Sequence, residues 1–270
     1  MFKKCGHRNR AGHSEKLKLS MRILKLFVLS TIANFVSFNS AWAGPPFITD
    51  DPETLEYQHW EINYAVSKSW RQGESSAATP SIDINYGASP NLQLHIQPRY
   101  SYERSMTDSH FGIDDTEVGM KYRFLNIQHD NFSFMVGTYP MLQLPTGDAK
   151  LGPNRGKVQS FLPLWLQGNI DKWTMYGGMG YRINPGSGNK NSVFFGMTTL
   201  YEVTQDFKLG GEIFHESPNS IDGVASTGFN LGGSYSLTHD YNVLFAAGKG
   251  LKNVSSTNEL STYLALQVLY

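Results

Sequence analysis

The chain has 270 residues, with 23 basic and 23 acidic side chains and a mean hydropathy of −0.34. Aromatic residues make up 13% of it, charged residues only 17%, and there are 26 glycines. This composition excludes a bundle of membrane-spanning helices, because each such helix needs an apolar run of about 20 residues. It fits a sheet-rich protein.

The first 43 residues (1–43) have the pattern of a cleavable signal peptide. Basic residues precede the apolar stretch from Leu26 to Phe38, and Ala41-Trp42-Ala43 supplies the small-x-small triplet that signal peptidase requires. We expect cleavage after Ala43. A start at Met21 would leave a conventional leader. An uncleaved inner-membrane anchor is the alternative, for which the apolar stretch is short.

Removal of this segment changes the charge and the thiol content. It holds 8 of the 23 Lys/Arg and 1 of the 23 Asp/Glu, so 15 basic and 22 acidic residues remain, a net charge of −7. That balance gives no reason to expect nucleic acid as a partner. The single cysteine, Cys5, is removed as well, which excludes disulfides and thiol catalysis in the mature chain.

Residues 44–56 carry Pro45, Pro46 and Pro52 and show no strand rhythm, so we predict an extended periplasmic lead-in folded against the periplasmic mouth of the protein. From 57 to 270 the chain falls into segments of about ten residues that alternate in polarity, as transmembrane barrel strands do. The clearest segment runs from Leu92 to Arg104, where polar and apolar side chains leave opposite faces.

These segments predict an all-β fold: an antiparallel, up-and-down transmembrane β-barrel of about twelve strands in the cell outer membrane. The strands are expected at 57–70, 77–87, 91–104, 115–125, 131–144, 158–169, 172–183, 192–203, 207–216, 225–237, 241–250 and 259–270. Longer loops are expected at 71–76, 105–114, 145–157, 184–191, 217–224 and 251–258. The even count places both termini on one side. Short turns are expected at 87–90, 126–130, 170–171, 204–206 and 238–240, and they indicate that this side is periplasmic.

Aromatic residues support this orientation, because amphipathic rings settle at the level of the lipid headgroups. Those near a short turn or the C-terminus are Tyr86, Phe124, Phe132, Trp173, Tyr201, Phe207, Tyr235, Tyr241 and Tyr270. The last strand ends in an apolar stripe on Tyr270, which resembles the signal read by the outer-membrane assembly machinery. We expect it to close the barrel against 57–70 rather than remain an ordinary edge strand, which would invite aggregation.

One strand breaks the simple alternation. In 158–169, Phe161 and Trp165 share the parity of Gln167. Either a β-bulge or an apolar patch in the lumen would explain this pattern, and the residues alone do not decide between them.

Four groups of residues carry a family resemblance. The stretch Gly44 to Glu53 (GPPFITDDPE) is followed by His59-Trp60-Glu61, then by Asn85-Tyr86-Gly87 and Pro90 to Leu94, and then by Asp115 to Gly119 with Lys121 to Phe124. This N-terminal third resembles the "MetA-pathway of phenol degradation" family of outer-membrane, transporter-like proteins. The resemblance implies an outer-membrane barrel and the passage of small, aromatic or hydrophobic solutes.

Parity places charged side chains inside the barrel. The candidate lumen and solute-binding residues are Glu61, Asp83, His95, Arg99, Glu103, Glu117, Lys121 and Arg123. We expect cross-strand pairs such as Glu103 with Arg123 and Arg99 with Glu117. They would form a polar filter for a solute, or else they would only neutralise one another and fill the lumen.

The later strands are expected to form a different wall. Their inward charges are sparser: Arg182, Glu202, Lys208, Glu212 and Glu216. Inward glycines, expected to leave open space, are Gly178, Gly180, Gly196, Gly210, Gly232 and Gly248. The lumen is therefore predicted to be asymmetric.

Three functions are compatible with this pattern. The first is a channel or transporter for a small solute. The second is a structural or interaction barrel that acts through the loops 105–114 and 145–157. The third is an outer-membrane lipid hydrolase built on His215, but no Gly-x-Ser-x-Gly elbow accompanies it. We therefore predict no enzyme, no catalytic residue, no metal site and no cofactor. The expected partners are outer-membrane lipids and lipopolysaccharide, the assembly machinery and a small-molecule solute.

Overall fold

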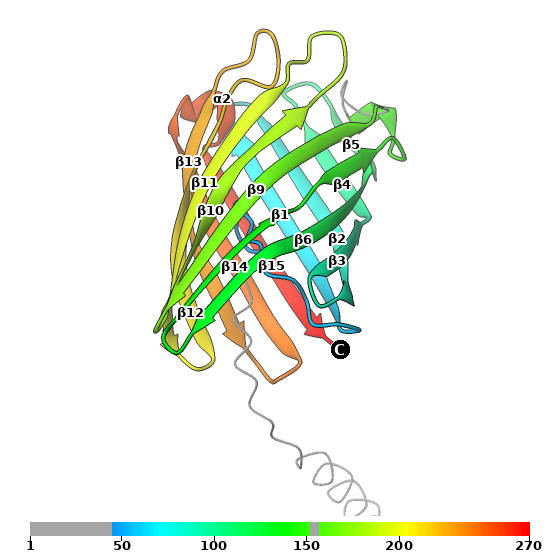
Figure 1. Ribbon diagram of the computed structural model, residues 1–270. Helices are drawn as coiled ribbons and strands as arrows, with labels where there is room; N and C mark the ends of the chain where they lie inside the picture. Colours follow the sequence, from blue (N-terminus) through cyan, green and yellow to red (C-terminus); the bar gives the residue numbers. More distant parts are fainter. Residues whose placement is uncertain (1–44, 152–156) are drawn as a thin grey trace, which may run out of the picture. The chain divides into compact units, whose positions relative to one another are not determined.

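A computed structural model describes residues 45–151 and 157–270 (Figure 1). The predicted signal peptide, 1–43, lies outside the described residues. Within 45–151 and 157–270, no helix is long and apolar enough to cross a membrane.

The described chain forms one closed antiparallel sheet, a twelve-stranded barrel (Figure 1). Three wall strands are each interrupted once, so the bounds number fifteen: β1 Trp60–Arg71, β2 Glu74–Ser89, β3 Leu92–Gln97 with β4 Arg99–Arg104, β5 Ser109–Ile113 with β6 Thr116–His129, β7 Phe132–Thr138 with β8 Met141–Leu144, β9 Gln159–Ile170, β10 Trp173–Ile183, β11 Ser192–Thr204, β12 Phe207–Glu216, β13 Ser226–Ser236, β14 Tyr241–Lys252 and β15 Leu260–Leu269. A 3-10 turn, η1 (Ala149–Leu151), and a short helix, α2 (Val254–Thr257), lie in two of the loops.

The barrel closes where the sequence predicts. β1 pairs with β15 in an unbroken antiparallel register from Glu61 opposite Leu269 to Trp70 opposite Leu260. Closure satisfies the backbone of both terminal strands, which removes the exposed edge that an open sheet would present.

The interruptions have local causes. Pro98 separates β3 from β4, and Pro140 lies between β7 and β8. Proline has no amide proton to donate to the ladder, so a strand breaks at these points. Between β5 and β6, the Asp114 carboxylate accepts hydrogen bonds from Ser101 Oγ and Arg99 Nε, and the Asp115 carboxylate accepts from the Gly147 amide.

Two loop predictions are wrong at one end of the barrel. The expected loop 71–76 is a two-residue turn, because Gly73 adopts a positive φ of 73° and lets β2 begin at Glu74. Half of the expected loop 105–114 is taken by β5, which pairs with β4.

The alternation of side chains follows the predicted parity. Exposed apolar side chains such as Leu94, Met120, Leu164 and Leu264 cover the outside, while polar side chains fill the inside. β9 pairs with β10 without a register shift from Ser160 to Ile170, and Phe161 and Trp165 are buried. The irregular parity of that strand is therefore an apolar patch in the lumen and not a bulge.

Candidate functional site in the barrel lumen

Residues 45–56, called the plug below, lie inside the lumen rather than at its mouth (the blue segment in Figure 1). The Phe47 ring is buried with Tyr176 of β10, Leu200 of β11 and Ala246 of β14. At the other end of the plug, the Leu55 amide donates to Gln93 Oε1 of β3, at 3.0 Å. The plug therefore crosses the lumen between opposite walls.

Glu212 of β12 holds the first part of the plug. Its carboxylate accepts hydrogen bonds from the amides of Ile48, at 2.9 Å, and Thr49, at 2.8 Å. Gly196 of β11 leaves room for this contact, since a Cβ on it would lie 2.0 Å from Thr49 Oγ1. The side chain of Thr49 is fully buried.

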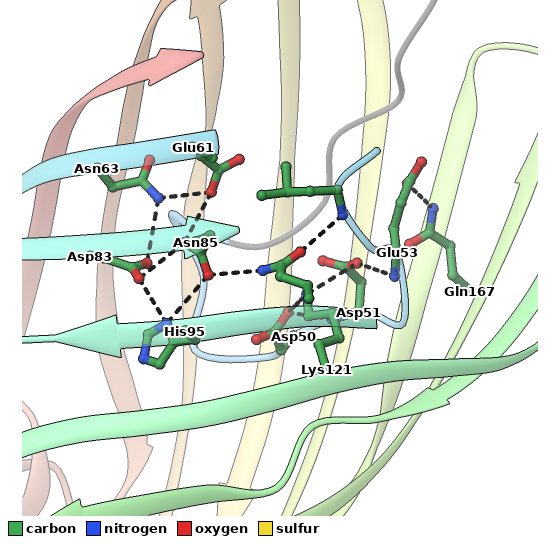
Figure 2. Close-up of polar contacts among 12 residues, drawn as sticks. Asp50, Asp51, Glu53, Glu61, Asn63, Asp83, Asn85, His95, Lys121 and Gln167 are labelled. Carbon is green, nitrogen blue, oxygen red and sulfur yellow. Dashed lines mark hydrogen bonds and ion pairs between the residues drawn. The ribbon is translucent and has the colours of Figure 1, made fainter. Parts of the chain in front are cut away.

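Lys121 of β6 holds the middle of the plug (Figure 2). Its Nζ lies 2.9 Å from Asp50 Oδ1 and 3.6 Å from Asp51 Oδ1. The lysine is only 3% exposed, and its Nζ lies 5.0 Å from the centroid of the Tyr139 ring. Burial raises the pKa of the Asp51 carboxyl, and the Lys121 ammonium opposes that rise.

Glu53 and its neighbours hold the last part of the plug. Gln167 Nε2 of β9 donates to Glu53 Oε2 (Figure 2), and the two atoms are 3.0 Å apart. Burial raises the pKa of the Glu53 carboxyl, while this hydrogen bond and Lys208 lower it. Pro52 packs against Gly137 of β7, and a Cβ on that glycine would lie only 2.9 Å from the Pro52 Cβ.

A polar network covers the wall formed by β1, β2, β3 and β6 (Figure 2). His95 lies between two carboxylates, with Nδ1 2.8 Å from Asp83 Oδ1 and Nε2 3.5 Å from Glu117 Oε1. Asn63 Nδ2 donates to Glu61 Oε1 at 2.9 Å, and Gln93 Nε2 donates to Asn85 Oδ1 at 2.8 Å. We call this surface the charged wall.

Five predicted lumen residues come together here: Glu61, Asp83, His95, Glu117 and Lys121. The predicted pairings are wrong. Arg99 Nε bonds Asp114, at 3.1 Å, and Glu117 faces His95 instead.

Glu103 and Arg123 also do not face each other. Glu103 lies across from Ser76 and His110, whereas Arg123 lies across from Gly137 and donates to the Pro90 carbonyl. The reason is the register, because β6 runs beside β3 and places Arg123 near the short-turn end of that strand.

An aromatic cluster adjoins the charged wall, and its Tyr139 ring lies 5.6 Å from the His95 ring. Its buried members are Tyr139, Phe161, Trp165, Phe194 and Phe214. Arg182 lies over the Phe161 ring at 4.7 Å and contacts Glu216 at 3.3 Å.

The glycines beside this cluster do not leave open space, contrary to expectation. A Cβ on Gly180 would lie 2.2 Å from the Phe161 ring, and one on Gly178 would lie 2.8 Å from the Trp165 ring. Glycine is therefore needed there for close packing of the rings against the wall.

Sequence reasoning missed Asp50, Asp51 and Glu53 as lumen residues. They precede the first strand, where no two-residue period assigns a face. The available signal was Lys121, which was predicted to face inward. No carboxylate on a neighbouring strand was predicted to pair with it, which indicated a partner elsewhere in the chain.

The packing around the plug leaves some polar atoms unsatisfied. Thr49 Oγ1, Asp51 Oδ2 and Gln167 Oε1 are buried without a hydrogen-bond partner among the described residues. Each such atom costs about 1–3 kcal/mol when it leaves water, so the docked plug is less stable than its contacts suggest. No group of three His, Cys, Asp or Glu within 45–151 and 157–270 is arranged to hold a metal ion.

Comparison with known proteins gives a family and a fold. Residues 65–263 match the family described as "MetA-pathway of phenol degradation". An outer membrane channel from Pseudomonas putida F1 aligns with a TM-score of 0.60 at 17% identity, over 85% of this chain and 100% of that chain. The KdgM porin aligns with a TM-score of 0.49 at 13% identity, over 77% and 98%. None of the curated proteins matches the sequence. At these identities the structural likeness shows the fold alone.

Proposed function

We propose that this chain, which belongs to the "MetA-pathway of phenol degradation" family and folds as an outer-membrane β-barrel, is a channel for small solutes that the plug gates. The observation that carries the proposal is the way in which the lumen is filled. A separate segment of the chain, and not the wall itself, crosses it and is held by side chains of β6, β9 and β12.

The plug contacts suit a reversible gate. They consist of a few ion pairs and hydrogen bonds, and several buried polar atoms around them have no partner among the described residues. When the plug leaves, water forms hydrogen bonds with those atoms. This offsets part of the free energy that is lost with the plug contacts. A permanently closed barrel would instead favour a fully satisfied core.

The walls exposed by plug release support a class of solute. The charged wall adjoins an aromatic cluster, since the Tyr139 ring contacts both His95 and Lys121. Rings of a solute can stack on aromatic side chains, while its polar group pairs with His95, Glu117 or Lys121. We therefore propose small aromatic or hydrophobic solutes that carry one polar group. The description of the family, which names phenol degradation, agrees with this class.

The barrel lies in the cell outer membrane. We propose that both termini are periplasmic, because the short turns and the paired rings of Trp60 with Tyr86 and Trp173 with Tyr201 are at one end. Lipopolysaccharide would then surround the long-loop end, and the assembly machinery would read the C-terminal strand.

Planar-bilayer conductance tests the channel. The purified barrel is expected to show rare, small openings, and deletion of residues 45–55 is expected to make them larger and more frequent. Arg99→Ala and Glu117→Ala in the deletion variant should change ion selectivity, because they remove opposite charges from the lumen. Absence of current in both the intact and the deletion variants would contradict a pore and favour a structural barrel.

We also propose that the chain is not an enzyme. His215 Nδ1 lies 2.8 Å from Thr227 Oγ1, and the Oγ of Ser217, the nearest serine in sequence, accepts a hydrogen bond from the Val193 amide. A serine hydrolase needs a serine oxygen at the histidine instead. Fatty-acid release from phospholipid micelles that is lost in His215→Ala would overturn this proposal.

A further inference from the structure

Charged side chains are divided unequally between the two faces of the barrel wall. The strand carboxylates take the inward parity: Glu61, Glu74, Asp83, Glu103, Glu117, Glu202, Glu212 and Glu216. Lys68 and Lys249 take the outward parity instead, toward lipid. The outer surface of the described strands therefore carries cations without matching carboxylates.

Pairing fixes the position of Lys68 on β1. It lies across from Thr262 of β15, whose neighbour Ser261 donates to Asn230 Oδ1 inside the barrel, so Thr262 and Lys68 must point outward. The Lys68 Nζ lies 4.8 Å from the centroid of the Trp70 ring on the same face. A tryptophan beside a lysine is typical of the headgroup region.

Two further lysines lie on β14. Lys249 is exposed and lies across from Phe229. Lys252, also exposed, lies across from Thr227 beyond a register shift, so it takes the outward face of Thr227 and His215. One strand, β15, separates them from Lys68. With strands about 4.8 Å apart and a rise of about 3.4 Å per residue, the Cα atoms of Lys68 and Lys249 lie about 12 Å apart. Their flexible stems let the ammonium groups meet one headgroup.

None of these three lysines forms an ion pair with a residue in 45–151 or 157–270. Below them the surface is strongly apolar, with Val66 49%, Leu231 62% and Leu264 57% exposed. A lysine at the edge of an apolar band is stable when its ammonium reaches an anionic headgroup. The outer surface therefore carries a group of lysines next to an apolar surface that acyl chains can contact.

We infer that Lys68, Lys249 and Lys252 form a site for one phosphorylated glycolipid of the outer leaflet. The inference rests on the proposed orientation, because the lysines lie at the long-loop end of the barrel. The belt of aromatic residues near the short turns lies at the other end. The phosphate groups pair with the ammonium groups, and the acyl chains lie along Val66 and Leu264. Charge complementarity selects this lipid, because its phosphate groups can pair with ammonium groups that have no carboxylate partner among the described residues.

Native mass spectrometry of the full barrel in detergent tests the site, with bisphosphorylated lipid A, dephosphorylated lipid A and phosphatidylglycerol as probes. The intact protein should retain one bisphosphorylated lipid A. In the triple variant Lys68→Gln, Lys249→Gln, Lys252→Gln, the amount of bound bisphosphorylated lipid A should be at least tenfold lower. Dephosphorylated lipid A should bind equally to the intact protein and to the triple variant. The variant Lys172→Gln, Lys190→Gln, altered in a turn and a loop, should behave like the intact protein.

Equal occupancy in the triple variant would overturn the inference, as would preferential binding of phosphatidylglycerol to the intact protein. Heat-modifiable migration on gels confirms that each variant is folded. Conductance is measured separately. A triple variant that loses the lipid but opens like the intact protein has lost only this site, and the proposed channel function is unaffected. A maleimide label on Ser187→Cys in intact cells tests the orientation independently.

Discussion

Lys121→Met tests how the plug is held. The substitution keeps the apolar stem but leaves Asp50 and the fully buried Asp51 without their cation. Removing one partner of a buried ion pair costs about 3–5 kcal/mol, and the lower end applies here because the Asp50 side chain is 19% exposed. At about 1.4 kcal/mol per factor of ten, the ratio of docked to released plug should fall on the order of a hundredfold.

A cysteine at Thr49 measures that ratio. Thr49 is fully buried, and its Oγ1 has no hydrogen-bond partner among the described residues, so Thr49→Cys should be tolerated. The single natural cysteine, Cys5, is expected to leave with the signal peptide. A polar maleimide then reacts only when the plug is released. In the Lys121→Met background its rate should rise on the order of a hundredfold.

Two controls make the result decisive. Lys190→Met removes an exposed loop lysine and should not change the rate. An exposed Thr107→Cys reports the intrinsic reactivity of the reagent in every background. If Thr49→Cys reacts equally fast with and without Lys121, the ion pair does not hold the plug, and the gating argument fails.

Three other outcomes follow from the same contacts. Glu212→Ala removes the acceptor for the Ile48 and Thr49 amides. Labelling of Thr49→Cys should become about tenfold faster, since hydrogen bonds to charged groups contribute about 1.5–3 kcal/mol. An unchanged rate would show that Glu212 of β12 does not hold the plug. Gly196→Ala puts a Cβ where Thr49 lies and should raise channel opening in bilayers, whereas Gly168→Ala, whose nearest atoms are 3.9 Å away, should not; equal effects would show that the plug does not contact β11. Ser69→Cys with Ser261→Cys should form a disulfide across the seam on mild oxidation, while Ser69→Cys with Thr262→Cys should not, because Thr262 points to the other face; cross-linking of the second pair would contradict the closing register.

The strands were predictable because their side chains repeat every two residues. Each of the twelve predicted segments overlaps a wall strand, and the outward parity of residues such as Leu94 and Leu264 follows directly from it. The predicted segment 91–104 did not include the break at Pro98, since one missing donor does not disturb the polarity pattern.

The site was predictable only where it lies on strands. Glu61, Asp83, His95 and Lys121 were assigned to the lumen by parity alone. Their partners could not be assigned, because the choice between Asp114 and Glu117 for Arg99 depends on the register and on a break in β5–β6. The plug has no period, so its contacts with Lys121 and Glu212, many residues away, could not be read from the sequence.

The plug precedes β1 in the chain, and β1 pairs with the last strand, β15. The finished wall therefore encloses a segment that precedes all of its strands in the chain. Ile48 and Glu212 are 164 positions apart, so their contact forms only when the wall has its final curvature. A register slip of one residue in β12 would turn Glu212 toward lipid and lose that contact. The same residues that close the lumen thus favour the correct register of the finished barrel over its neighbours.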